Sequence, residues 1–482
     1  MNFARDVVAA RPADAEALIA LDRAGGRASW TFGELTERSG RLAASLLARG
    51  VGRGDVVMTV VGNRPEWVLT LLACFRIGAV ALPCTEQLRA RDLALRLRVA
   101  RPRAIVADAR DLTELRAASP DCPLLVIPDE NEELFGDAAP NPAPFAELAP
   151  DDPSLIVFTS GTSGEPKAVV HGQRYLGGQA TQAEHWLGAA PGDLVWCTAS
   201  AGWSKSARNT FVAPWLRGAR ALLHDARFDA AERLDLIERE GVTVLCMAPT
   251  EYRVIAKRAR LRRLSTLRSA VAAGEALNAE IVDCWIAEAG VHVRDGFGQT
   301  ETGAITGIRP EATPRPGSMG LPLPGIAVEL RDGELFVDPA SDPTFFLGYL
   351  GAEPPAGMWA TGDLVERDDD GYLWFRGRND DVIVSAGYRI GPVEVEEALA
   401  SHPAVADAAV VAAPDEERGA VVRAVVVVRD GWEADAALAA DLQEHVKQQT
   451  APYKYPRVVD FARELPRTSS GKVRRALLRD GG

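Results

Sequence analysis

A dense run of glycine, serine and threonine residues follows an apolar, strand-like segment that ends at Phe158. The run reads Thr159-Ser160-Gly161-Thr162-Ser163-Gly164-Glu165-Pro166-Lys167. Its backbone N–H groups and hydroxyls can donate hydrogen bonds to an anion, its glycines allow a close approach, and Lys167 adds positive charge. It is not a Walker A loop, because Pro166 precedes the lysine and no Gly-Lys-Ser/Thr sequence closes it. The run therefore predicts a phosphate-binding loop, and its place directly after a buried strand argues against a flexible linker.

Five further segments place acids, bases or hydroxyls beside glycines later in the chain. In order they are Ala273-Gly274-Glu275-Ala276-Leu277-Asn278, Asp295-Gly296-Phe297-Gly298-Gln299-Thr300-Glu301-Thr302, Ala360-Thr361-Gly362-Asp363, Gly377-Arg378-Asn379-Asp380-Asp381 and Ser470-Gly471-Lys472. Taken singly, each has an ordinary interpretation: Thr-Gly-Asp is typical of a surface turn, Thr-Glu of a helix start, and a basic tail of a solvated face. Their order along one chain is what points to a common function.

The six segments occur in the order found in the acyl-adenylate-forming (AMP-binding) superfamily of acyl-CoA synthetases, adenylation domains and luciferases. The chain resembles this superfamily over nearly its whole length. The resemblance implies ATP-dependent activation of a carboxylic acid to an acyl-adenylate with release of pyrophosphate, and then transfer of the acyl group to coenzyme A. An acyl ligase that loads the phosphopantetheine thiol of an acyl carrier protein is the alternative. A noncatalytic nucleotide-binding or scaffold protein is a third hypothesis, and the intact Lys167, Glu301, Asp363 and Lys472 argue against it.

The resemblance also implies roles for individual residues. Thr300 and Glu301 are implied to be catalytic, with Glu301 as a Mg²⁺ ligand, because carboxylate oxygens suit a metal that bridges phosphate oxygens. Lys472 is implied to stabilise the charge that develops as pyrophosphate leaves. Asp363 and Arg378 are implied to hold the ribose hydroxyls. Phe297 is implied to stack on the adenine, with an ordinary core phenylalanine as the alternative interpretation. The full set implied to contact ATP is Thr159, Ser160, Gly161, Thr162, Ser163, Gly164, Lys167, Gly274, Glu275, Ala276, Asp295, Gly296, Phe297, Gly298, Gln299, Thr300, Asp363, Arg378 and Lys472.

The thiol-transfer half of the reaction is implied to use the C-terminal part of the chain. Gly387, which lacks a Cβ, leaves room for a pantetheine arm. Arg389, Arg418 and Lys447 match cations implied for the nucleotide end of coenzyme A, although exposed basic residues usually face solvent. Asp380 is implied to be a hinge between a large N-terminal AMP-binding domain, residues 1–379, and a small mobile C-terminal domain, residues 380–482.

Within the superfamily the chain is most similar to the medium-chain acyl-CoA synthetases. The stretches that carry this similarity are Gly202-Trp203, Gly298 to Gly303, His445 to Lys447 and Thr450 to Arg457. Gly298 stands where acetate-specific relatives carry a tryptophan that closes the acyl pocket, so a medium-chain, branched or aromatic acid is expected. Trp203 is the candidate pocket wall, with an ordinary core tryptophan as the alternative interpretation.

The residues around Trp203 bear on the kind of acid. No acidic side chain lies near Trp203 to hold an ammonium group, which disfavours an amino-acid substrate. Several polar residues follow Trp203 where aliphatic ones would line a simple fatty-acid tunnel. They either face away from the pocket or favour a polar or dicarboxylic acyl group, and they are Lys205, Ser206, Arg208 and Asn209.

Strand-like runs alternate with amphipathic helical stretches as in βαβ units. This alternation predicts an α/β fold with layered sheets that would position these residues. Expected strands are Asp55–Val61, Leu155–Phe158, Thr243–Met247 and Ser269–Ala273. Thr31 with Glu34 predicts a capping box, and Asn63 with Glu66 a second helix start. Residues 128–153 are expected to form a surface connection. The C-terminal α+β unit is expected to contain helices at Val393–Ser401 and Ala436–Lys447 and strands at Ala406–Ala412 and Val421–Val428.

Composition sets the outer limits of these inferences. The 482 residues are 47% apolar and 25% charged, which predicts a globular protein of two or more domains. The net charge is −13 and no long block of Lys or Arg occurs, so no nucleic-acid partner is expected. Six well-separated cysteines exclude C-x-x-C spacing and predict buried free thiols. No signal-like or membrane-spanning stretch is seen, which predicts a cytoplasmic protein, either monomeric or homodimeric.

Overall fold

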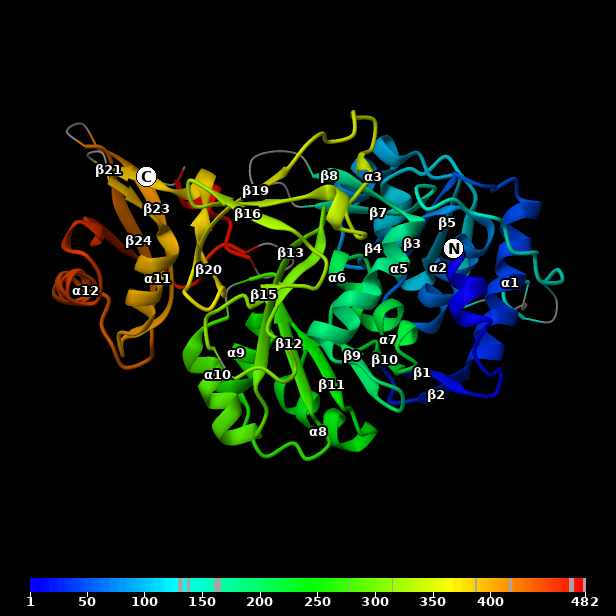
Figure 1. Cartoon of the computed structure of the whole chain (residues 1–482), viewed down its shortest axis with the longest axis horizontal. Helices are drawn as coiled ribbons and strands as arrows, with labels where there is room; N and C mark the ends of the chain where they lie inside the picture. The colour runs from blue at the N-terminus through cyan, green and yellow to red at the C-terminus, as the bar shows by residue number, and fades with distance from the viewer. Residues whose placement is uncertain are drawn as a thin grey trace. The chain divides into compact units, whose positions relative to one another are not determined.

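A computed structural model of the chain describes residues 1–128, 133–136, 139–159, 166–275, 277–313, 315–385, 388–415, 418–467 and 472–479 (Figure 1). The chain divides into two compact units. The first consists of Met1–Ala327 with Asp338–Trp359, and the second of Val328–Val337 with Ala360–Gly482. The fold is α/β with a large N-terminal part and a smaller C-terminal part, as expected.

The first unit contains two large sheets. The nine-stranded sheet has the order β15 (Leu321–Pro322), β14 (Gly303–Gly307), β13 (Val293–Gln299), β12 (Ser269–Ala273), β11 (Val244–Met247), β9 (Leu194–Cys197), β10 (Arg220–His224), β1 (Glu16–Leu21) and β2 (Arg27–Thr31). The seven-stranded sheet has the order β18 (Gly348–Tyr349), β8 (Lys167–Gly172), β7 (Pro153–Thr159), β4 (Val80–Cys84), β3 (Val56–Val60), β5 (Ala104–Asp108) and β6 (Leu124–Ile127). Central strands of both sheets pair in parallel, which agrees with the βαβ alternation in the sequence.

Helices cover both faces of each sheet. Between the sheets lie α1 (Phe32–Ala48), α2 (Pro65–Ile77), α5 (Gln173–Gln182), α6 (Ser204–Ala207), a helical turn at Arg208–Val212, and α7 (Ala213–Leu216). On the outer face of the nine-stranded sheet lie α8 (Ala230–Glu240), α9 (Pro249–Arg258) and α10 (Ala279–Cys284), and Figure 1 shows α9 and α10 across that sheet from α5 and α7. The seven-stranded sheet is covered outside by α3 (Ala90–Ala100) and α4 (Leu112–Ala117).

Large aromatic residues fill the layer between the two sheets. Trp67, Phe211 and Trp215 are fully buried, and their rings pack edge-on or tilted with centroids 5.7 Å and 4.9 Å apart. Burying each such side chain contributes about 2–3 kcal/mol. The segment α6–α7, which follows the predicted pocket residue Trp203, is therefore anchored firmly in the core.

The two predicted helix starts have different outcomes. Thr31 caps α1 as expected: its side chain accepts from the Glu34 N–H at 3.2 Å, and Glu34 accepts from the Thr31 N–H at 2.8 Å. The prediction that Asn63 caps α2 is wrong, because Arg64 is the N-cap and no side chain caps this helix. Asn63 instead accepts a hydrogen bond from the N–H of Ala201 at 2.8 Å. Pro65 at the first helical position explains why no cap is needed there.

Most other sequence predictions agree with the structure. The four predicted strands are β3, β7, β11 and β12, and all six cysteines are free, four of them buried and two half-buried. The connection before β7 is not confined to the surface, because its described part buries Leu134, Phe135 and Ala143. Among the described helices, none combines the length and apolar character needed to span a bilayer.

The second unit is built on smaller sheets. Its four-stranded sheet has the order β16 (Val328–Arg331), β17 (Glu334–Val337), β19 (Trp359–Arg367) and β20 (Leu373–Arg378). A hairpin of β21 (Ile383–Ser385) and β22 (Tyr388–Ile390) follows, and then a sheet of β23 (Val405–Asp415), β24 (Gly419–Val428) and β25 (Val458–Phe461) with helices α11 (Pro392–Ala400), α12 (Ala436–Gln449) and α13 (Arg475–Arg479). The predicted C-terminal helices and strands are thus present. Residues 360–379, predicted to belong to the N-terminal domain, group with the C-terminal residues, while the hinge at Asp380 stays a prediction.

Candidate active site

The turn between β13 and β14 carries the predicted catalytic pair Thr300 and Glu301. Gln299 and Gly303 face each other across this antiparallel hairpin, and the Gln299 N–H donates to Thr302 Oγ1 at 3.0 Å. The register shifts between Phe297 and Gly298, so the hairpin contains an irregularity at that point. A Cβ on Gly298 would lie 1.8 Å from the Gly303 carbonyl oxygen. The backbone of this chain's hairpin therefore leaves no room for a Cβ at this position.

Glu301 lies close to a tyrosine that the sequence analysis did not single out. The Tyr349 hydroxyl donates to Glu301 Oε1 at 2.9 Å, and the Phe346 N–H donates to the Glu301 carbonyl at 2.8 Å. The ammonium nitrogen of Lys167 lies 4.9 Å from the centroid of the Tyr349 ring. Burial and the Glu301 carboxylate raise the pKa of Tyr349, which keeps it a hydrogen-bond donor. The aromatic run Phe345–Tyr349 was the available sequence signal for this residue.

Lys167 begins β8, and its backbone is paired with Thr159 at the end of β7. The two ends of the predicted phosphate loop are thus held together by the antiparallel β7–β8 pair, and the Lys167 side chain is exposed. Ser160, Gly161, Thr162, Ser163 and Gly164 lie outside the described residues. Their phosphate-binding role stays a prediction.

The predicted adenine segments meet at the carboxyl ends of neighbouring parallel strands. β12 and β13 pair with Ala273 opposite Gly296, so Gly274 directly follows β12 and Asp295 lies on the adjacent strand β13. Asp295 is buried, its Oδ1 accepts from the Gly296 N–H at 2.9 Å, and burial raises its pKa well above the usual range. Glu275 accepts from Thr250 Oγ1 at 2.9 Å. Phe297 is half-buried, and Ala276 lies outside the described residues.

Trp203 differs from the core tryptophans. Trp67, Trp186, Trp196, Trp215 and Trp285 are fully buried, whereas Trp203 is only half-buried. The preceding Gly202 has a φ of +101°, and a Cβ there would lie 2.4 Å from the Thr85 nitrogen, so the loop is pressed against the end of β4. Asn63 holds the same loop through Ala201. Half burial distinguishes Trp203 from the fully buried core tryptophans, and its role as a pocket wall stays a prediction.

The polar residues after Trp203 point in different directions. Lys205 donates from its ammonium group to the Ala273 carbonyl at 3.1 Å, at the end of β12 and beside the predicted adenine segment. Ser206 and Asn209 are buried and bond within the core, to the Ala199 carbonyl and the Gln182 amide. Arg208 is also buried. Arg208 Nη1 would lie 3.5 Å from a Cβ on Gly303 at the start of β14. Lys205 and Arg208 therefore reach towards the predicted site segments, whereas Ser206 and Asn209 do not.

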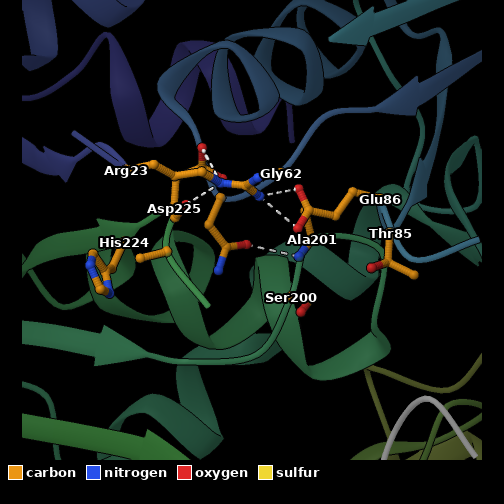
Figure 2. A pocket seen from close by; sticks show the side chains of 10 residues that line it. Arg23, Gly62, Thr85, Glu86, Ser200, Ala201, His224 and Asp225 are labelled. Atoms are coloured by element: carbon orange, nitrogen blue, oxygen red, sulfur yellow. Dashed lines mark hydrogen bonds and ion pairs between the residues drawn. The ribbon is translucent and has the colours of Figure 1, made fainter. Parts of the chain in front are cut away.

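A polar surface pocket lies near the Trp203 loop but contains none of the predicted site residues. Figure 2 shows its lining at the carboxyl ends of several parallel strands, including Arg23, Glu86, Ser200 and Asp225. Arg23 pairs with Glu86 at 2.7 Å, and Asp225 pairs with the nearby Arg110 at 2.7 Å. These charges are satisfied within the protein, so the pocket is not a preformed site for a charged ligand.

In the second unit, Asp363 and Arg378 face each other on β19 and β20. Arg378 Nη1 lies 3.1 Å from Asp363 Oδ1, and the Asp363 side chain is buried. Lys472 is exposed beside the isolated bridge between Arg467 and Val473. The structure therefore brings the predicted ribose pair together and leaves Lys472 accessible.

The predicted coenzyme A residues lie on the same unit. Lys447 on α12 lies 3.1 Å from Glu444 and 4.6 Å from the Tyr455 ring centroid, and the Arg418 N–H donates to Asp415 at 2.8 Å. Gly387 and the side chains of Arg389 and Asp380 lie outside the described residues. The exposed rings of Tyr388 and Tyr453 stack at 4.3 Å, a feature that the sequence analysis did not predict.

Comparison with protein families is consistent with this geometry. Residues 5–343 match the AMP-binding enzyme model, and residues 394–472 match the model of the AMP-binding enzyme C-terminal domain. The chain belongs to the AMP-binding enzyme family.

Individual relatives narrow the class further. The chain is 38% identical to the uncharacterized acyl–CoA ligase YtcI of Bacillus subtilis, over 96% of this chain and 92% of that protein. It is 38% identical to the mitochondrial acyl-coenzyme A synthetase ACSM4 of Rattus norvegicus, over 99% of this chain and 90% of that protein. The crystal structure of the anthranilate CoA ligase AuaEII with anthranoyl-AMP superposes with a TM-score of 0.88 at 27% identity, covering 99% of this chain and 96% of that one. The enzyme is thus an AMP-forming acid–thiol ligase of the acyl-CoA synthetase class.

Proposed function

We propose that this ligase activates a medium-chain, branched or aromatic carboxylic acid, using Mg-ATP held by Lys167, Glu301, Asp363 and Arg378. In the first step the substrate carboxylate attacks the α-phosphorus of ATP and pyrophosphate leaves. In the second step the thiol of coenzyme A attacks the acyl carbonyl carbon and AMP leaves. The observation that carries the proposal is that Lys167 and Glu301, which come from different sheets, both contact Tyr349.

The residues near Glu301 fit a nucleotide-bound magnesium ion. Mg²⁺ is commonly held by one or two carboxylates together with substrate phosphates and waters. Glu301 supplies one carboxylate, and the described residues contain no cluster of three acidic, His or Cys side chains that would form a cage. When bound, the ion neutralises phosphate charge and orients the phosphate oxygens.

The remaining roles belong to the chain's own side chains. Lys167 contributes positive charge next to the phosphate loop, and Asp363 with Arg378 offers an acceptor and a donor to the ribose hydroxyls. Lys472 offers an exposed ammonium group that can stabilise charge as pyrophosphate leaves. Arg389, Arg418 and Lys447 are proposed to bind the nucleotide end of coenzyme A, with Gly387 beside the pantetheine.

The choice of acid rests on the surroundings of Trp203. Its half-buried indole is available as a pocket wall, and no acidic side chain of the loop is present to hold an amino group. The structurally similar anthranilate CoA ligase acts on an aromatic acid, which supports an aromatic substrate here. Because the hairpin leaves no room for a Cβ at Gly298, the case for a longer acyl chain now rests more on Trp203 than on Gly298.

A substrate panel tests this proposal. Purified enzyme is incubated with Mg-ATP and straight, branched or aromatic acids, and pyrophosphate release is measured with and without coenzyme A. Release with at least one such acid, followed by acyl-CoA formation, is expected. Absence of pyrophosphate release with every acid would overturn the proposal. Faster acyl transfer to a carrier-protein phosphopantetheine than to coenzyme A would identify the carrier protein, and not coenzyme A, as the acceptor.

A further inference from the structure

Tyr349 contacts both groups proposed to hold Mg-ATP in the first unit. Its hydroxyl donates to Glu301 Oε1 at 2.9 Å, and the Lys167 ammonium nitrogen lies 4.9 Å from the centroid of its ring. One aromatic residue thus bonds an anion through its polar tip and a cation through its π face.

The backbone fixes Tyr349 firmly in this position. β18 pairs with β8, with Tyr349 opposite Val169, and the flanking Leu347 and Leu350 N–H groups donate to β8 carbonyls at 2.7 Å and 2.8 Å. On the other side, the Phe346 N–H donates to the Glu301 carbonyl at 2.8 Å. The segment Phe346–Leu350 therefore connects β8, which follows the phosphate loop, to the catalytic turn.

An aromatic cluster stabilises the same strand. The ring of Phe346 packs 5.2 Å from Tyr349 and 5.1 Å from Trp359, between centroids, and Trp359 Nε1 donates to Gln299 Oε1 at 3.1 Å. Packing therefore holds the ring of Tyr349, whereas the hydroxyl makes a separate contact with Glu301. The two roles can be separated by mutation.

The placement solves an electrostatic problem. If the Glu301 carboxylate and the Lys167 ammonium were in direct contact, they would form an ion pair. The carboxylate oxygens would then be less available to a metal, and the ammonium protons less available to a phosphate. Within the described residues, Glu301 and Lys167 form no ion pair with each other inside 4.0 Å, and Tyr349 lies against both. The tyrosine therefore fixes both charges without neutralising either.

We propose that Tyr349 is a positioning residue that orients Glu301 and Lys167 for Mg-ATP, an inference that rests on the proposed roles of those two residues. Its hydroxyl orients Glu301 for the metal, and its ring supports Lys167 beside the phosphates. Loss of the hydroxyl alone is expected to weaken metal-dependent nucleotide binding, and loss of the ring is expected to weaken metal-free binding as well.

Calorimetric binding of α,β-methylene-ATP, which cannot be adenylated, tests the proposal without turnover. Tyr349→Phe is expected to bind the analogue about tenfold more weakly with Mg²⁺, the size of one hydrogen bond to a charged group, and nearly normally without it. Tyr349→Leu is expected to lose affinity under both conditions. Tyr372→Phe, which removes a tyrosine hydroxyl in the other unit, is the matched control and is expected to bind normally.

Glu301→Gln separates the possible failures. If it abolishes the Mg²⁺ effect and Tyr349→Phe does not reduce it, the positioning role is overturned while the role of Glu301 stands. If Glu301→Gln leaves the Mg²⁺ effect intact, both the proposed metal ligand and the inference are overturned. Thermal unfolding of each variant identifies losses due to misfolding, and a misfolded Tyr349→Leu leaves Tyr349→Phe as the deciding variant.

Discussion

The two carboxylates proposed to hold Mg-ATP, Glu301 and Asp363, lie in very different surroundings. Glu301 is partly accessible and bonded by one tyrosine, whereas Asp363 is buried against the guanidinium of Arg378. The first arrangement leaves a carboxylate oxygen available for a ligand. The second holds a carboxylate in a fixed orientation, which suits recognition of paired hydroxyls.

The surroundings of His171, which has no role in the proposed reaction, determine its protonation. It is fully buried on β8, and its ring lies 4.0 Å from that of Tyr175. Neither ring nitrogen has a hydrogen-bond partner of normal geometry in the described part of the chain. Burial, with a contribution from Arg208, lowers the pKa of His171 to about 3.

This shift predicts a pH-dependent stability. Below a pH of about 6.5 the unfolded chain takes up a proton at His171 that the folded chain does not, so stability is lost as pH falls from there towards about 3. Linkage gives a loss of about 2 kcal/mol between about pH 7 and pH 5. His171→Asn is expected to remove this part of the pH dependence, measured as the difference between urea unfolding free energies at the two pH values.

A neighbouring group makes the comparison between variants necessary. Burial raises the pKa of Asp342 to about 6, so its folded form gains a proton as pH falls and offsets part of the His171 effect. Asp342 is present in both proteins and cancels in the difference. Parallel stability curves for the two proteins would contradict the prediction.

At the scale of elements, the β13–β14 hairpin and β18 together position the catalytic turn. The hairpin turn carries Thr300 and Glu301 at the end of β13, and Phe346, just before β18, donates its N–H to the Glu301 carbonyl while β18 pairs with β8 of the seven-stranded sheet. The geometry of the turn therefore depends on contacts with both sheets.

Gly298→Ala tests the hairpin. A Cβ at this position would lie 1.8 Å from the Gly303 carbonyl oxygen and 2.9 Å from the Ala304 Cα, both of them backbone atoms that cannot rotate away. The variant is expected to lose about 3 kcal/mol of stability and most adenylation activity, because the hairpin must open and move Glu301. Thermal unfolding and pyrophosphate release measure the two effects.

Gly52→Ala is the matched control for this substitution. A Cβ on Gly52 meets only Asp55, at 3.9 Å, and the residue is far along the chain from the hairpin. Its stability and activity are expected to stay close to those of the unmodified enzyme. A Gly298→Ala protein with the same stability as this control would show that the hairpin accommodates a side chain.

At the scale of the whole molecule, the proposed machinery is divided between two compact units. Lys167 and Glu301 belong to the first unit, and Asp363, Arg378 and Lys472 belong to the second. A two-step reaction in which different groups are needed for adenylation and thiol transfer suits such a division. The predicted hinge at Asp380 lies within the second unit as it is defined by contacts.

Lys472→Ala is expected to separate the two half-reactions. Removing the ammonium group is expected to lower acid-dependent pyrophosphate release about 100- to 1,000-fold, because charge on the leaving pyrophosphate loses its stabilisation. ATP binding and transfer from a supplied acyl-adenylate to coenzyme A are expected to persist. The two half-reactions are assayed separately on the same preparation.

Lys447→Ala provides the opposite comparison. Loss of this cation is expected to raise the KM for coenzyme A and to leave pyrophosphate release in the absence of coenzyme A unchanged. An equal loss of both half-reactions in Lys472→Ala, or unchanged adenylation, would contradict the role given to Lys472.

Much of the fold follows from local patterns in the sequence. The capping box at Thr31 and the strands β3, β7, β11 and β12 were predictable because capping and burial periodicity involve neighbouring residues. The predicted cap at Asn63 is wrong because the Asn63 side chain makes a tertiary hydrogen bond instead, accepting from the N–H of Ala201, which lies 138 residues away along the chain. The buried segment around Phe135 was taken for a surface connection because its composition resembles a loop.

The sequence by itself determined the family, the reaction class and the identity of the polar residues, since these depend on residue types and order. Only the tertiary structure showed that Tyr349 bonds Glu301 across 48 residues and supports Lys167, and that the hairpin leaves no room for a Cβ at Gly298. Such contacts join segments distant along the chain, and a side chain's partner is set by where the sheets bring it. The chemical character of each group therefore follows from its residue type, whereas its orientation and its partners depend on the tertiary structure.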